Sequence, residues 1–243
     1  MDAGLYTARP EGLRREHAYD RLKTALLVGD YPLNRRLAEE RLAAQLGVSR
    51  TPVREALLRL AAEGLVERSP EGGWYPTAPD VAAVHDLYEV RLVLELQGLR
   101  RPVQVGRSTA HDPAALEPLR DEWRALSAAA PEPDPGFVTL DEDFHVRLAA
   151  SSGNPTLADL LRLVNERIRI VRMHDFLTEE RVRRTIVQHI EIVEAVLAGD
   201  LTLAVARFGV HLGESMAVVE DRATRALARM ASGRGGMGMG MRA

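Results

Sequence analysis

The sequence contains no cysteine among its 243 residues. This absence excludes disulfide bonds, thiolate nucleophiles and cysteine-based zinc fingers, so any bound metal must be held by histidine and carboxylate side chains. Long apolar runs are also missing. The longest fall well short of the roughly 20 residues that span a bilayer, and the N-terminus lacks the apolar stretch of a signal peptide. We therefore expect a soluble, cytoplasmic protein without a membrane partner.

Positive charge is in slight deficit and unevenly distributed. The chain has 32 Lys and Arg against 35 Asp and Glu, a net charge of −3. Residues 1–78 are slightly basic and residues 79–243 are acidic, and six arginines lie between positions 35 and 59. A chain of this length typically holds two domains. The local positive charge lies where an element that contacts DNA phosphates would need it.

The first part of the chain has the pattern of a winged helix-turn-helix. Helical spacing of apolar residues covers 18–28 and 36–46, and Gly47 suits a helix C-cap. Ser49 is a good N-cap and Pro52 suits a first turn, which predicts a helix over 50–63. The segments 65–68 and 74–75 flank a turn and predict a β-hairpin wing. We assign this DNA-binding domain to residues 12–78.

The rest of the chain shows helical patterns with almost no strand signal. They cover residues 80–101, 113–129, 136–151, 156–176, 178–198 and 200–230, separated by Pro-rich and Gly-rich breaks. The fold class is therefore mainly α, and residues 79–231 should form an antiparallel bundle of six or seven helices. Residues 232–243 are rich in Gly without a core-forming pattern, and we expect a disordered tail.

The segment Leu46-Gly-Val-Ser-Arg-Thr-Pro-Val-Arg-Glu-Ala-Leu57 resembles the helix-turn-helix of the GntR family of bacterial regulators. On a helix that opens at Ser49, hydroxyl and guanidinium groups occupy the exposed face, where they can contact bases and phosphates. The resemblance implies a double-stranded DNA partner and contacts from Arg41, Ser49, Arg50, Thr51, Arg54 and Gly73. Two positions depart from the family. Gly72 stands where a basic residue usually precedes the wing glycine, and Glu40 stands where many relatives carry Arg.

Four side chains in the helical part form a candidate metal site. Asp141 and His145 are four residues apart, so they project from one helix face and can reach the same ion. His189 and His211 lie on apolar stripes of two other helices. Either histidine alone is more often a core residue with a hydrogen-bond partner. Together, the four side chains suit a borderline metal ion and leave positions open for another ligand.

The same residues, with Leu148, Ser152-Gly-Asn154 and Ala198-Gly-Asp200, resemble the FCD effector domain of FadR-like GntR regulators. With the helix-turn-helix, the resemblance covers about residues 12–225. It implies a divalent metal held by Asp141, His145, His189 and His211, zinc first, with nickel or manganese as alternatives. It also implies a small organic acid effector that contacts Arg91. The other interpretation of Arg91 is a salt bridge to Glu95, one helical turn away.

These features together predict a repressor that binds a pseudo-palindromic operator as a homodimer and responds to a carboxylate. In one alternative the metal ion itself is the signal. A metal-dependent hydrolase is a weaker alternative, because the sequence has no HExxH, P-loop or GxGxxG motif and no nucleophile motif. An acyl-CoA-responsive regulator is also disfavoured, since that branch of the FCD class is understood to lack the metal ligands. We therefore expect a regulator and not an enzyme.

Overall fold

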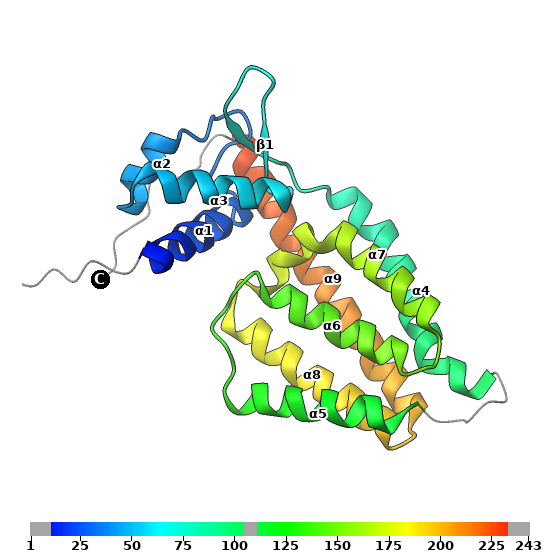
Figure 1. Ribbon diagram of the computed structural model, residues 1–243. Helices are drawn as coiled ribbons and strands as arrows, with labels where there is room; N and C mark the ends of the chain where they lie inside the picture. The colour runs from blue at the N-terminus through cyan, green and yellow to red at the C-terminus, as the bar shows by residue number, and fades with distance from the viewer. Residues whose placement is uncertain (1–10, 105–110, 233–243) are drawn as a thin grey trace, which may run out of the picture. The chain divides into compact units, whose positions relative to one another are not determined.

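The computed structural model describes the backbone of residues 11–104 and 111–232. It describes the side chains of residues 15–100 and 111–232. The chain divides into two compact units, residues 1–79 with 225–243, and residues 80–224. Figure 1 shows helices throughout and one small antiparallel sheet in the described ranges, which confirms the mainly helical fold class. The predicted disordered tail, apart from its first residue, lies outside these ranges.

The N-terminal unit is a winged helix-turn-helix. Its elements are α1 (Glu11–Leu27), α2 (Glu39–Leu46), α3 (Arg50–Ala62), β1 (Val66–Arg68) and β2 (Trp74–Pro76). Helix α1 packs against α3, and the apolar stripes of both helices are buried, with Leu22, Val53 and Leu57 at 1 % exposure or less. Burial of these stripes holds the helix-turn-helix together, because each fully buried side chain contributes about 1.5–3 kcal/mol.

The turn between α2 and α3 follows the sequence pattern closely. Gly47 adopts φ +66°, a left-handed conformation that favours glycine, and its N–H donates to the Ala43 carbonyl. Ser49 occupies the N-cap position of α3, but its side chain makes no capping hydrogen bond. The predicted start of the preceding helix at residue 36 is wrong. The Leu37 N–H donates to the Trp74 carbonyl at 2.8 Å, so this segment pairs with the hairpin instead.

The C-terminal unit is a helical bundle, as predicted. It contains α4 (Val81–Gln104), α5 (Pro113–Ala128), α6 (Phe137–Ala150), α7 (Pro155–Arg172), the 3₁₀ helix η1 (Met173–Phe176), α8 (Glu179–Leu197) and most of α9 (Leu201–Ser232). Helix α5 packs on α8, and α7 packs on both α4 and α6. No helix in the described part of the chain is long and apolar enough to cross a membrane.

Two helix ends in the C-terminal unit differ from the sequence prediction. Helix α4 continues past Pro102 to Gln104, although proline was expected to end it. Helix α7 gives way to η1 at Met173, where a continuous helix was expected to residue 176. The Arg222 guanidinium donates to the carbonyls of His174 and Asp175 at 2.9 Å each, which satisfies acceptors that this tighter turn leaves free.

Candidate metal centre and nucleic-acid interface

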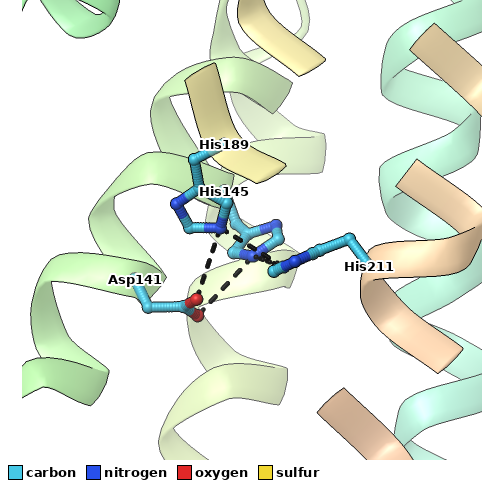
Figure 2. A group of neighbouring side chains, drawn as sticks. All are labelled: Asp141, His145, His189 and His211. Carbon is cyan, nitrogen blue, oxygen red and sulfur yellow. Dashed lines mark hydrogen bonds and ion pairs between the residues drawn. The ribbon is translucent and has the colours of Figure 1, made fainter. Parts of the chain in front are cut away.

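Three helices bring the four predicted metal-ligating side chains to one point. Helix α6 supplies Asp141 and His145, α8 supplies His189 and α9 supplies His211. Their ligand atoms all lie within 4.8 Å of one another, and each residue is at most 1 % exposed. Figure 2 shows the three imidazole rings and the carboxylate directed toward a shared centre. The sequence pattern therefore predicted correctly that these four side chains lie together.

The separations between the ligand atoms suit a metal ion. The His211 Nε2 atom lies 3.2 Å from both the His145 Nε2 and the His189 Nε2 atoms. The Asp141 carboxylate oxygens lie 3.4 Å from His189 Nε2 and 3.5 Å from His145 Nε2. Ligands about 2.0–2.2 Å from an ion have neighbours roughly 2.9–3.6 Å away, depending on the coordination number. These four of the six separations fall in that range, and all six are within 4.8 Å.

The partners of the outer ring nitrogens strengthen the case for a cation. His145 Nδ1 donates to Glu95 Oε2 at 2.5 Å, and His211 Nδ1 donates to Gln188 Oε1 at 3.0 Å. In a neutral imidazole the other nitrogen, Nε2, then carries a lone pair. If both rings are neutral, two Nε2 lone pairs face each other at 3.2 Å and repel. A bound cation removes this repulsion, and carboxylate or amide partners on the outer nitrogen are typical of metal-bound histidine.

Burial and neighbouring charges set the protonation of the cluster. Burial by itself raises the pKa of Asp141, but the adjacent Arg172 guanidinium, together with His145 and His189, outweighs it, so the pKa lies well below its usual range. Burial lowers the pKa of His189 to about 4 and lowers the pKa of His211 well below its ordinary value. These shifts favour an ionised carboxylate at Asp141 and neutral imidazoles at His189 and His211, which are the protonation states that bind metal ions.

Aromatic rings pack against two histidines of the cluster. The Phe144 ring stacks on the His189 ring with centroids 3.8 Å apart, and Trp123 meets His189 edge-on at 4.2 Å. Phe208 lies edge-on to His145 at 5.5 Å. These rings fix the imidazole orientations and exclude water, which strengthens electrostatic interactions inside the site.

Two fully buried arginines border the Asp141 carboxylate. Arg91, which sequence analysis assigned to the effector, donates through Nε to Glu95 Oε1 at 2.6 Å, so the alternative salt bridge is present. Its Nη1 and Nη2 atoms have no hydrogen-bond partner in the described part of the chain, although Nη2 lies 3.9 Å from Asp141 Oδ2. Arg172 Nη2 donates to Asp141, while its Nε and Nη1 atoms lack hydrogen-bond partners among the described residues.

Two features of the cluster were not predicted from the sequence, namely Arg172 and the role of Glu95 as a partner of His145. A signal for Arg172 existed, because the residue lies four positions after Ile168 and continues the buried stripe of α7 through Leu161 and Ile168. A charged residue on a buried stripe needs a charged or ligand partner. Glu95 was considered only as a partner of Arg91, and its contact with His145 crosses from α4 to α6, which local spacing cannot predict.

The predicted DNA-contacting residues of α3 lie on its exposed face. Ser49, Arg50, Thr51 and Arg54 are exposed, whereas Val53 and Leu57 are buried as expected. The two arginines are paired with the start of α2. Arg54 Nη2 lies 2.9 Å from Glu39 Oε2, and Arg50 lies 3.6 Å from Glu39 and 3.4 Å from Glu40. These acidic groups orient the guanidinium groups, and the predicted bidentate contacts to guanine would require their release.

The wing carries a basic side chain that sequence analysis did not assign to it. Gly73 has φ +106°, and a Cβ atom there would collide with the side chain of Arg36. The exposed Arg36 therefore lies against the wing glycine, where it supplies the positive charge that Gly72 lacks. Arg41, the remaining predicted contact, donates to the Arg36 carbonyl at 2.7 Å.

Comparison with known proteins gives a consistent family. The model of the family described as bacterial regulatory proteins, gntR family, matches residues 14–75, and the FCD domain model matches residues 86–214. The Nta operon transcriptional regulator of Aminobacter aminovorans is 38% identical over 144 residues, which are 58% of this chain and 65% of that protein. The chain thus spans just under two thirds of that regulator.

Two further comparisons cover more of the chain. An uncharacterized HTH-type transcriptional regulator from the unstable DNA locus of Streptomyces ambofaciens is 33% identical over 202 residues, covering 82% of this chain and 81% of that protein. A structure of a GntR regulator from Rhodococcus sp. RHA1 shares the fold, with TM-score 0.51, 24% identity and coverage of 85% and 97%. The relatives are named as regulators, which confirms the expectation that this is not an enzyme. The chain therefore belongs to the GntR family of bacterial regulatory proteins, and it is a DNA-binding transcriptional regulator with an FCD domain.

Proposed function

We propose that this regulator is a homodimeric repressor whose affinity for a pseudo-palindromic operator is controlled by a small organic acid. Asp141, His145, His189 and His211 would hold a divalent metal, zinc first, beside the effector. When bound, the ion would act as a Lewis acid that attracts a carboxylate oxygen. The observation that carries the proposal is the pair of buried arginines at this cluster whose guanidinium nitrogens lack hydrogen-bond partners among the described residues.

The unpartnered nitrogens favour an anionic ligand with several acceptor atoms. A buried guanidinium without partners is costly, and a planar carboxylate satisfies two of its N–H groups at once. Arg91 offers Nη1 and Nη2 on the same fork, and its Nε bond to Glu95 holds that fork in place. Arg172 is held in the same way by Asp141. The chain thus orients donors for a carboxylate before the ligand arrives.

The balance of buried charge in the C-terminal unit favours the same ligand class. Among the described residues of this unit, buried carboxylates outnumber buried guanidinium groups by one; they are Glu95, Asp141, Glu142 and Asp175 against Arg91, Arg172 and Arg181. These groups carry a net charge of −1 when histidines are left out of the count, and with a divalent ion in place the sum becomes +1. One carboxylate neutralises this excess, and uncompensated buried charge is strongly unfavourable.

One helix could communicate binding to the DNA-binding unit. Helix α9 carries His211, and its last residues belong to the N-terminal unit. There, the Leu33 N–H donates to the Met230 carbonyl at 3.3 Å, and the Arg229 guanidinium donates to the Val28 carbonyl at 3.2 Å. A ligand that favours one position of α9 can therefore favour one arrangement of the recognition helices.

Exposed apolar side chains support the homodimer. Helices α4 and α7 pack together in the C-terminal unit, and Val93 and Leu163 remain 67% and 57% exposed on them. Val90 and Leu160 are 47% and 46% exposed on the same two helices. We propose that a second copy covers this surface, because two half-sites of an operator require two recognition helices. Val93→Glu should yield monomers in sedimentation experiments, with the matched exposed change Val210→Glu on α9 as the control.

The test measures operator binding by fluorescence anisotropy, with metal-loaded and chelator-treated protein, against a panel of small carboxylic and sugar acids. We expect at least one acid to change operator affinity, and only when the metal is bound. The His189→Ala variant should lose metal occupancy and this response together. If free metal alone changes operator affinity and no acid adds to it, the ion is the signal and the carboxylate proposal is wrong. Full metal occupancy in His189→Ala would reject the ligand assignment.

A further inference from the structure

A polar groove lies between α6 and α7, outside the metal cluster. It has a volume of about 220 Å³. Both helices contribute side chains with the spacing i, i+3, i+4 and i+7, so one face of each helix lines the groove. These residues are Thr139, Glu142, Asp143 and Val146 on α6 and Arg162, Asn165, Glu166 and Arg169 on α7. The seam between two packed helices is normally apolar, yet only Val146 in this set is apolar.

Asn165 forms part of the floor of this groove and has unmet hydrogen-bonding capacity. The residue is 1% exposed, and neither its Oδ1 nor its Nδ2 atom has a hydrogen-bond partner in the described ranges. Burying an amide without partners costs on the order of 1–3 kcal/mol, so such groups are normally satisfied by protein, water or a ligand. An amide needs both an acceptor for its N–H groups and a donor for its oxygen.

The charges around Asn165 define the ligand chemistry. Arg169 Nη2 donates to Glu142 Oε2 at 2.6 Å. Arg162 forms an ion pair with Asp159 at 2.5 Å, and Asp159 does not belong to the groove lining. Glu142 forms ion pairs with Arg169 and Arg172, yet its Oε1 atom accepts no hydrogen bond, and Glu166 has no ion-pair partner within 4.0 Å among the described residues. The atoms with unmet hydrogen-bonding capacity on these two residues are therefore carboxylate oxygens, which are acceptors. A protonated amine, with three N–H donors and no acceptor, fits them.

We propose that the α6–α7 groove binds a small amino compound, a protonated amine next to an oxygen acceptor, as in a free amino acid. The ammonium group donates to Glu142 Oε1, Asn165 Oδ1 and the Glu166 carboxylate. The adjacent ligand oxygen accepts from Asn165 Nδ2. The volume is many times that needed for one ordered water and suits a molecule of amino-acid size.

The groove is connected to the metal cluster through Glu142. Its Oε1 atom lies 3.5 Å from Arg172 Nη1, and Arg172 pairs with Asp141. An ammonium group that engages Glu142 competes with Arg172 for this oxygen and leaves Arg172 freer to bind an anion at the cluster. This link rests on the proposed function, whereas binding in the groove does not require it.

The experiment measures binding of free amino acids to the full-length chain by isothermal titration calorimetry, preceded by a thermal-shift panel. Ethanolamine tests an amine with a neutral oxygen, and ethylamine tests an amine without one. Asn165→Leu removes both amide atoms at similar volume, and it should fold because it removes buried polar atoms that lack partners. Glu166→Gln changes one exposed charge and should fold in any case. Glu117→Gln, an exposed change on α5, is its matched control.

We expect one or more amino acids to bind, ethylamine to bind at least tenfold more weakly, and Asn165→Leu to lower affinity at least tenfold. Glu166→Gln should lower affinity severalfold, and Glu117→Gln should bind like the wild type. The same series in chelator-treated protein separates this site from the proposed effector site, because groove binding should persist without metal. If no amine binds the wild type at millimolar concentration, or if Asn165→Leu and Glu166→Gln both bind normally, the groove is not this ligand site.

Discussion

Gln188→Met tests the tautomer argument without touching a metal ligand. In the wild type, Gln188 Oε1 accepts from His211 Nδ1 at 3.0 Å and so holds the Nε2 lone pair toward His145 and His189. Methionine fills a similar volume but accepts a hydrogen bond only weakly. In the metal-free variant the His211 proton can move to Nε2, which removes the repulsion between facing lone pairs. Metal binding must then restore the original tautomer, and affinity falls.

The expected size follows from the contacts that change. Loss of a hydrogen-bond partner on the outer nitrogen of a metal-bound histidine typically lowers affinity by about tenfold to 100-fold. This is about 1.4–2.7 kcal/mol at 1.36 kcal/mol per factor of ten. The other bond of Gln188, from Nε2 to Glu214 Oε2 at 2.7 Å, reaches a half-exposed carboxylate that Arg184 also binds. Its loss should therefore change the affinity little.

The assay is competition for zinc between the protein and a fluorescent chelator at pH 7. Gln45→Met, an exposed change on α2, serves as the matched control and should bind zinc like the wild type. Circular dichroism shows whether the variant is folded before titration. A folded Gln188→Met variant with affinity within twofold of the wild type would refute the claim that the outer partner of His211 prepares the cluster for a cation.

Three other predictions concern the DNA-binding unit and its link to the bundle. Arg50→Ala and Arg54→Ala should each weaken operator binding by about 1–3 kcal/mol in fluorescence anisotropy, and unchanged affinity in both would reject α3 as the reading helix. Burial and the neighbouring Glu63 raise the pKa of Tyr19, so its stabilising contribution is complete below the unfolded pKa of about 10 and is lost as pH rises above it. Chemical denaturation from pH 9 to 11 should thus show a steeper loss for the wild type than for Tyr19→Phe, and equal slopes would contradict the assigned shift. Two glycines inserted between residues 224 and 225 of α9 should abolish the control of operator affinity by the effector. Metal affinity and operator binding should stay intact. If the effector still controls operator affinity, α9 is not the connection between the bundle and the DNA-binding unit.

The helix-turn-helix was predictable because its signals are local. Gly47 ends α2 through a backbone conformation that other residues rarely adopt, and Ser49 and Pro52 mark the start of α3 within four residues. The start of α2 was predicted three residues early for the opposite reason. Leu37 continues the apolar helical pattern, but its N–H is used by Trp74, a residue 37 positions later. Local periodicity carries no information about such a pairing.

The cluster of Asp141, His145, His189 and His211 was predictable to the level of its four members and no further. Asp141 and His145 share a helix face by spacing alone, and histidines on buried stripes of two other helices point to the same core. The hydrogen-bond partners of the outer ring nitrogens depend on how the helices pack against one another. Glu95 lies on α4, which begins more than 50 residues before α6, the helix that carries His145. Local spacing predicted only the contact of Glu95 with Arg91.

Helix α6 explains how one short segment can serve two sites. Successive residues on an α-helix point about 100° apart, so Asp141 faces the histidine cluster while Glu142 faces the groove along α7. Arg172 contacts both carboxylates, because its guanidinium has donors on more than one edge. A change in the charge held by Glu142 therefore alters the electrostatic environment of Asp141 through a single side chain, without any movement of the backbone. This arrangement makes Arg172, and not a metal ligand, the residue through which occupation of the groove would influence the cluster.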